Sequence, residues 1–167
     1  MSDLDATFVN LDPTPDMPAP AGRDFTARLR TAIDGLPRGG TVWFPPGDFR
    51  INTPFSVPGQ ITLAFAPGAR LVPIRPEPMP ARLLDAALQI AGVIETELDA
   101  IFATSATAPD DLRSSITRRV GRVVLVGEGN PRVYVEWWGA AADFSPRAEV
   151  DRVAIEAALL AVTIDRD

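Results

Sequence analysis

The sequence predicts a mainly β domain with short amphipathic helices near both ends of the chain. Short β-prone runs follow one another at intervals of roughly ten residues between positions 41 and 74, and prolines and glycines separate them. No helix-length segment lies between these runs, which argues against a doubly wound α/β sheet. The spacing by itself fits a sandwich, a barrel or a β-solenoid.

The first expected helix covers residues 24–36. Apolar side chains recur there at spacings of three and four, at Phe25, Leu29, Ala32, Ile33 and Leu36. Asp24 is the expected N-cap, and Pro37 with the Gly39-Gly40 pair ends the helix.

The expected strands follow directly, at residues 41–44, 48–51, 55–57, 61–65 and 69–74. Pro45, Pro46 and Gly47 predict a stiff corner between the first two of them, with Asp48 as a turn residue. Gly39 and Gly40 are expected to let the chain leave the helix and approach the neighbouring strand closely.

The middle of the chain is open to two interpretations. Residues 82–102 carry a helical apolar stripe, but residues 88–95 also read as two short strands around Gly92. Residues 104–117 indicate a loop, 123–126 a strand that ends at Gly127, and 133–138 a further β-prone run. If that last run is extended, Trp137 and Trp138 point to opposite faces, one inward and the other towards a partner or solvent.

A second amphipathic helix is expected at residues 150–162, with apolar residues Val153, Ile155, Ala158, Leu159 and Val162 and with Asp143 as a cap. Before the first helix, residues 1–22 are expected to form an extended arm, because prolines fall at 13, 15, 18 and 20. Phe8, Val9 and Leu11 are candidates for docking on a neighbouring protein; the alternative is a frayed terminus. Residues 23–167 are expected to form one domain.

The composition excludes several kinds of site. The chain has no cysteine and no histidine, so it offers no disulfide, no thiolate or imidazole metal ligand and no Ser-His-Asp triad. We expect no metal and no cofactor. The net charge of −6 argues against nucleic-acid binding. No apolar run is long enough to span a membrane, and the acidic N-terminus lacks the form of a signal peptide, so we expect synthesis in the cytoplasm and no membrane insertion.

Two segments resemble a known family. One joins GGTVWFPPGDFRI (residues 39–51) to ITLAFAPGARLVPI (61–74), and the other joins VYVEWWGAAADF (133–144) to AIEAAL (154–159). Together they resemble the N-terminal region of pectate-lyase-like right-handed parallel β-helix proteins, as found in phage tailspikes and fibres. LQIAGVIETELDAIF (88–102) is similar to a family stretch of strand, glycine and strand, which favours strands there. The resemblance implies a truncated right-handed parallel β-helix of few coils, capped by helices.

The family includes lyases, hydrolases and inert stalks, so the resemblance fixes no activity. Family enzymes use carboxylate clusters on long solenoids, and this chain is too short for such a groove, so we expect no catalytic residues. Trp43, Trp137 and Trp138 are candidates for contact with carbohydrate or a partner, with core packing as the alternative.

We therefore expect a structural component, a base, adaptor or attachment protein, of a spike or fibre on a phage or a phage-like particle such as a gene transfer agent. Its expected partners are further copies of itself, as a trimer or a vertex-matched ring, and other capsid, tail or fibre proteins. The alternative is a β-helix protein that binds or degrades a host surface polysaccharide.

Overall fold

All pairs of named strands in this protein are parallel. The computed structural model describes residues 8–10, 25–52, 55–74, 87–97, 100–108, 120–141 and 148–162. Sheet A has the order β1 (Phe8–Asn10), β2 (Gly40–Phe44), β5 (Ile61–Phe65), β8 (Val93–Glu95). Sheet B pairs β3 (Gly47–Asn52) with β6 (Ala69–Ile74), and sheet C has the order β4 (Phe55–Val57), β7 (Ala87–Ile90), β9 (Arg122–Leu125).

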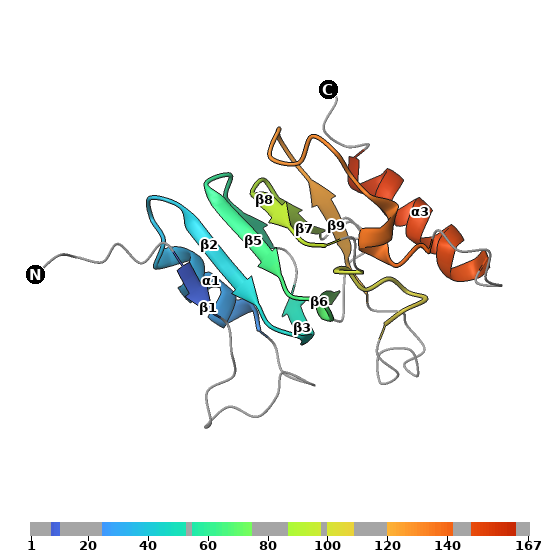
Figure 1. Cartoon of the computed structure of the whole chain (residues 1–167), viewed down its shortest axis with the longest axis horizontal. Coiled ribbons are helices and arrows are strands. Elements are labelled where there is room, and N and C mark those ends of the chain that lie inside the picture. Colours follow the sequence, from blue (N-terminus) through green and yellow to red (C-terminus); the bar gives the residue numbers. More distant parts are fainter. Residues whose placement is uncertain are drawn as a thin grey trace, which may run out of the picture.

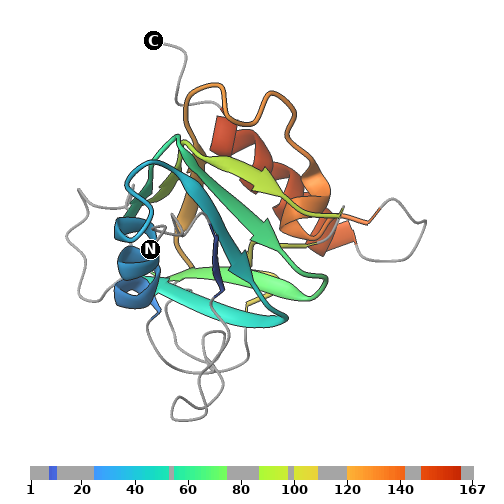
Figure 2. The ribbon, with the colours of Figure 1, turned by 60° about the vertical axis from the view of Figure 1, so that its left-hand side comes forward.

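The chain visits the three sheets in rotation. From β2 to β8 the strands belong in turn to sheets A, B, C, A, B, C and A. Four successive strands therefore pair with the strand three elements further along: β2 with β5, β3 with β6, β4 with β7 and β5 with β8. Strands β2 and β5 lie side by side in both views of the molecule (Figures 1 and 2).

The two α-helices of the described residues lie at opposite ends of this arrangement. Helix α1 (Thr26–Asp34) lies with β1 and β2 at one end, and α3 (Ala148–Val162) lies beside β9 at the other (Figure 1). Between β9 and α3 the chain forms a short 3₁₀ helix, η2 (Val135–Trp138). The mainly β fold, with an α-helix towards each end of the described residues, agrees with the sequence prediction.

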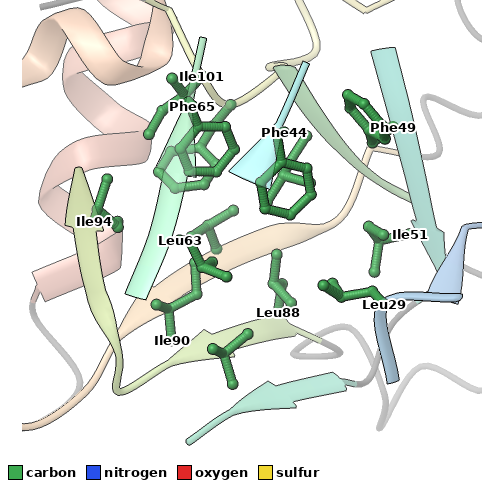
Figure 3. Close-up of a cluster of buried hydrophobic side chains, with 14 of the residues drawn as sticks. Leu29, Phe44, Phe49, Ile51, Leu63, Phe65, Leu88, Ile90, Ile94 and Ile101 are labelled. Atoms are coloured by element: carbon green, nitrogen blue, oxygen red, sulfur yellow. The ribbon is translucent and has the colours of Figure 1, made fainter. Parts of the chain in front are cut away.

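The parallel register places apolar side chains directly over one another in the core. In sheet A, Val42 pairs with Leu63 and Leu63 with Ile94, and all three are buried. Phe44 and Phe65 are register partners whose rings stack, with centroids 4.7 Å apart and planes 8° apart. Figure 3 shows side chains of all three sheets pointing into one shared interior, among them Phe44, Leu63 and Phe65 of sheet A, Phe49 and Ile51 of sheet B, and Leu88 and Ile90 of sheet C.

Helix α1 covers the edge of the β2–β3 region. Leu29 is completely buried, the Phe25 ring meets Phe49 edge-on at 5.0 Å, and the backbone N–H of Phe25 donates to the Arg50 carbonyl over 2.6 Å. The residue at the N-cap position is Phe25, which makes no side-chain capping bond. Asp24 and Asp143, the expected helix caps, lie outside the described residues. The helix is therefore held by its buried apolar face.

The glycine corner after α1 brings two chain segments into close contact. Gly39 has φ +94°, and a Cβ atom there would lie 2.7 Å from the Gln60 carbonyl oxygen. The next residue, Gly40, donates its N–H to the same carbonyl over 3.3 Å. The following corner begins with a buried Pro45 and an exposed Pro46. The N–H of Gly47, which has φ +137°, donates there to the Gly68 carbonyl over 3.1 Å. These residues set the tight spacing between successive parallel strands.

Residues 87–95, which the sequence left open, form strands β7 and β8 on either side of Gly92. The helical interpretation is wrong for this part of the chain. Leu88 and Ile90 are buried while Gln89 between them is exposed, which is the alternation of a strand. Gly92 packs so closely on the Ile61 carbonyl that no side chain fits.

Part of the expected N-terminal arm belongs to sheet A. The backbone of Phe8–Asn10 forms β1 and pairs in parallel with Thr41, Val42 and Trp43 of β2. Leu11 lies outside the described residues. Docking of this segment on a neighbouring protein stays a prediction, because in the single chain its backbone already pairs with β2.

We predict that Phe44→Ala lowers the free energy of unfolding by about 3–5 kcal/mol, because the deletion leaves a cavity between the rings of Phe65 and Phe49. Urea denaturation followed by circular dichroism measures the loss. Trp43→Ala is the matched control, since Trp43 is only half-buried on the opposite face of β2, and it should cost clearly less. Equal losses for the two variants would contradict the inward orientation of Phe44.

Candidate functional site

The tandem tryptophans lie in the core. Trp137 and Trp138 are 4% and 2% exposed, and both belong to η2. The Trp138 ring lies 5.1 Å from that of Phe102, and the Trp137 ring lies 5.5 Å from that of Tyr134. The Trp137 carbonyl accepts hydrogen bonds from the N–H groups of Ile101 and Phe102, each over 2.9 Å. The 3₁₀ helix η2 therefore ties the segment around Phe102 to the part of the chain that precedes α3.

The prediction of an extended run at residues 133–138, with one tryptophan facing outwards, is wrong. In a 3₁₀ helix consecutive side chains do not alternate between two faces, and η2 contacts both α3 and the Phe102 ring. Gly139 ends the turn in a left-handed conformation, with φ +95°. Both indoles are thus buried, and neither points out to open solvent.

Trp43 is the tryptophan that retains surface exposure. It is half-buried, and it lies on β2 between the buried residues Val42 and Phe44. Strand alternation therefore directs its ring to the outer face of sheet A. It belongs to the first part of sheet A, whereas Trp137 and Trp138 pack beside α3, so the three candidate tryptophans do not form one site.

Helix α3 buries its small residues and exposes its large ones. Ala154, Ala158 and Ala161 are buried against the β9 side of the protein. Ile155, Leu159 and Val162 are 44%, 59% and 38% exposed. Their spacing of four and three residues places them on one stripe, which we call the α3 apolar face. The sequence predicted an apolar stripe here, but alanines provide most of its buried contact.

The one arginine of α3 pairs with two of the carboxylates of the same helix. Arg152 donates to both carboxylate oxygens of Glu149, over 3.0 and 2.8 Å, and to Glu156 over 2.6 Å. The hydrogen bonds to Glu149 and, to a smaller degree, the bond to Glu156 raise the pKa of the Arg152 guanidinium above its already high usual value. The pairs are fully exposed and contribute little to stability. They leave the α3 apolar face as the distinctive surface of this helix.

A cavity of about 320 Å³ lies between α3, the start of β9 and the segment around Thr104. Its apolar wall includes Val123, Trp138 and Ala157, and its polar groups include Arg122 and Glu156. The Arg122 Nη2 atom donates to the Leu160 carbonyl over 2.6 Å, which joins β9 to the end of α3. The volume of this cavity is at the small end of the range for ligand pockets.

A second polar link joins sheet B to the loop beside this cavity. Asp48 and Arg70 are register partners on β3 and β6, and Arg70 donates to both oxygens of Asp48 over 2.9 Å. The remaining arm of Arg70 donates to the Thr107 carbonyl over 2.7 Å. Asp48, interpreted from the sequence as a turn residue, is therefore half of a bidentate ion pair that positions the 104–107 loop.

Within the described ranges, no three His, Cys, Asp or Glu side chains gather closely enough to hold a metal ion. None of the helices in the same ranges is both long and apolar enough to span a membrane. Comparison with protein-family models, with curated proteins and with solved structures finds no match for this chain.

Proposed function

We propose that this chain is a short right-handed parallel β-helix that serves as a non-catalytic structural part of a spike or fibre on a phage or phage-like particle, such as a gene transfer agent. The observation that carries the proposal is the rotation of the chain through sheets A, B and C with parallel pairing at each return. Parallel crossovers are right-handed in nearly all proteins, which supports that hand here.

The two ends of the strand arrangement differ in a way that supports an assembly role. The outer side of α1 carries the exposed residues Ala27, Arg30, Thr31 and Asp34. At the opposite end, α3 exposes Ile155, Leu159 and Val162. Because contiguous exposed apolar side chains mark association surfaces, the α3 end is the better candidate for contact with another protein.

The occupant that we propose for the α3 apolar face is a second copy of the chain. A chain of this size with few strands per sheet has a small core, and self-association compensates for that. Arg152 forms ion pairs with both Glu149 and Glu156, which partly offsets the charge of the two carboxylates and so favours contact between apolar faces. Trimers or vertex-matched rings both remain within this proposal.

The link to a particle comes from the two segments that resemble tailspike and fibre proteins, residues 39–74 and 133–159. In the structure the first segment forms strands β2 to β6, and the second includes η2 and much of α3. A part that joins a particle to a fibre needs stable surfaces at two ends more than it needs a catalytic groove. The partners beyond this chain would be capsid, tail or fibre proteins.

We predict that Leu159→Arg lowers the oligomer mass of the purified chain in light scattering, because it places a charge at the centre of the α3 apolar face. Ala27→Arg adds the same side chain to the exposed side of α1 and should leave the mass unchanged. A wild-type chain that is monomeric at high concentration would contradict self-association through α3.

The particle assignment has its own test. Antibodies against the chain, coupled to gold, should label projections on phage-like particles sedimented from the source culture. Recovery of the chain entirely outside the sedimented particles would contradict the assignment.

The glycan alternative is favoured by the cavity beside Arg122 and Glu156. Binding of the wild-type chain to a glycan array, lost in Glu156→Gln, would support that alternative instead.

A further inference from the structure

The side chain of Asn130 lies against the outer edge of β8, which is the last strand of sheet A among the described residues. Its Nδ2 atom donates to the Gly92 carbonyl over 2.9 Å. Its Oδ1 atom accepts the N–H of Ile94, also over 2.9 Å. The two bonds enclose Val93, the residue between Gly92 and Ile94.

This pattern is the one by which a neighbouring parallel strand binds. Elsewhere in the structure Leu71 forms a parallel bridge with Phe102. The Leu71 N–H donates to the carbonyl of Ile101 over 2.7 Å, and the Leu71 carbonyl accepts the N–H of Ala103 over 2.9 Å. Asn130 does the same around Val93 with its side-chain carboxamide, which carries the same donor and acceptor types as a peptide group.

The approach of Asn130 to β8 depends on the glycine before it. A Cβ atom on Gly129 would lie 2.5 Å from the Ala91 carbonyl oxygen and 3.2 Å from that of Gly92. The chain is also held nearby by the Val126 N–H, which donates to the Ile90 carbonyl over 3.0 Å. Pro131 restricts the backbone of Asn130 to extended conformations. The sequence Gly129-Asn130-Pro131 thus fixes the amide at the strand edge.

An uncovered edge at β8 would be a template for another strand. Unpaired N–H and C=O groups on an edge strand invite pairing with a second chain. β8 is an edge strand of sheet A within the described residues, and Val93 at its start is 37% exposed. The edge bonds nearest to Val93 are the ones that Asn130 occupies.

We propose that Asn130 terminates sheet A: its carboxamide takes the place of the next strand on β8 and blocks edge-to-edge addition of a strand from a second copy of this chain. The device is independent of the particle assignment. It also complements the association through α3, because it leaves β8 closed to pairing while the α3 apolar face stays open.

Hydrogen exchange of the Ile94 amide tests the hydrogen bond directly. In Asn130→Ala this amide should exchange about tenfold faster, as expected for loss of one hydrogen bond, while the Leu63 amide in the interior of sheet A should not change. Gln89→Ala removes a carboxamide from an exposed position on β7 and should leave Ile94 protected. Unchanged exchange of Ile94 in Asn130→Ala would overturn the proposal.

Light scattering of the same variants tests the blocking role. Asn130→Ala should form larger, concentration-dependent species, also in the Leu159→Arg background, where association through α3 is removed. Faster exchange at Ile94 without any added association would overturn the blocking role. If Asn130→Ala does not fold, Asn130→Gln serves in its place, because it keeps the amide but displaces it by one methylene. This variant should show faster Ile94 exchange and added association, both to a smaller degree. Wild-type behaviour in Asn130→Gln would count against the proposal.

Discussion

In-register parallel pairing is the constraint on which the rest of this structure depends. When a strand returns to a sheet in register, each inward side chain lies over the inward side chain of the preceding strand, as Phe65 does over Phe44 and Leu63 over Val42. An apolar position in one strand therefore requires an apolar position in the next. The same spacing leaves no space for a side chain at Gly39, where the chain enters β2 from α1, or at Gly92, where it passes from sheet C to sheet A; each of these glycines lies against a neighbouring carbonyl.

A parallel arrangement of this kind leaves two open ends, and the protein treats them differently. Helix α1 covers the β2–β3 region with Phe25 and Leu29 and turns polar residues outwards. At the other end, α3 covers β9 through alanines, and Asn130 occupies the edge of β8. The alanine contacts leave Ile155, Leu159 and Val162 at the surface. This difference supports the proposed role in a spike or fibre, because a connecting part needs one end that closes its own sheets and another that offers a contact.

The strands of residues 41–74 and both α-helices could be predicted because local signals agree there: apolar periodicity, β-prone runs and glycine or proline corners. Residues 87–95 could not be decided locally, since Leu88, Ile90 and Ile94 fit a helical stripe, and only pairing with β4 and β5 makes them strands. The prediction for the tandem tryptophans was wrong because tertiary contacts set their turn. These contacts are the hydrogen bonds from the N–H groups of Ile101 and Phe102 to the Trp137 carbonyl. The cavity and the Asn130 edge contact join segments far apart in sequence, so spacing alone gives no signal for them.

The absence of cysteine permits one direct test of the pairing. Thr41 and Thr62 are half-buried register partners on β2 and β5, and neighbouring strands at about 4.8 Å place their Cα atoms within the range that a disulfide spans. Under mild oxidation, Thr41→Cys/Thr62→Cys should form an intramolecular disulfide, measured by intact mass, whereas Thr41→Cys/Ser56→Cys should not. A meander that pairs β2 with β3 instead would leave the first pair reduced, and that result would contradict the parallel arrangement.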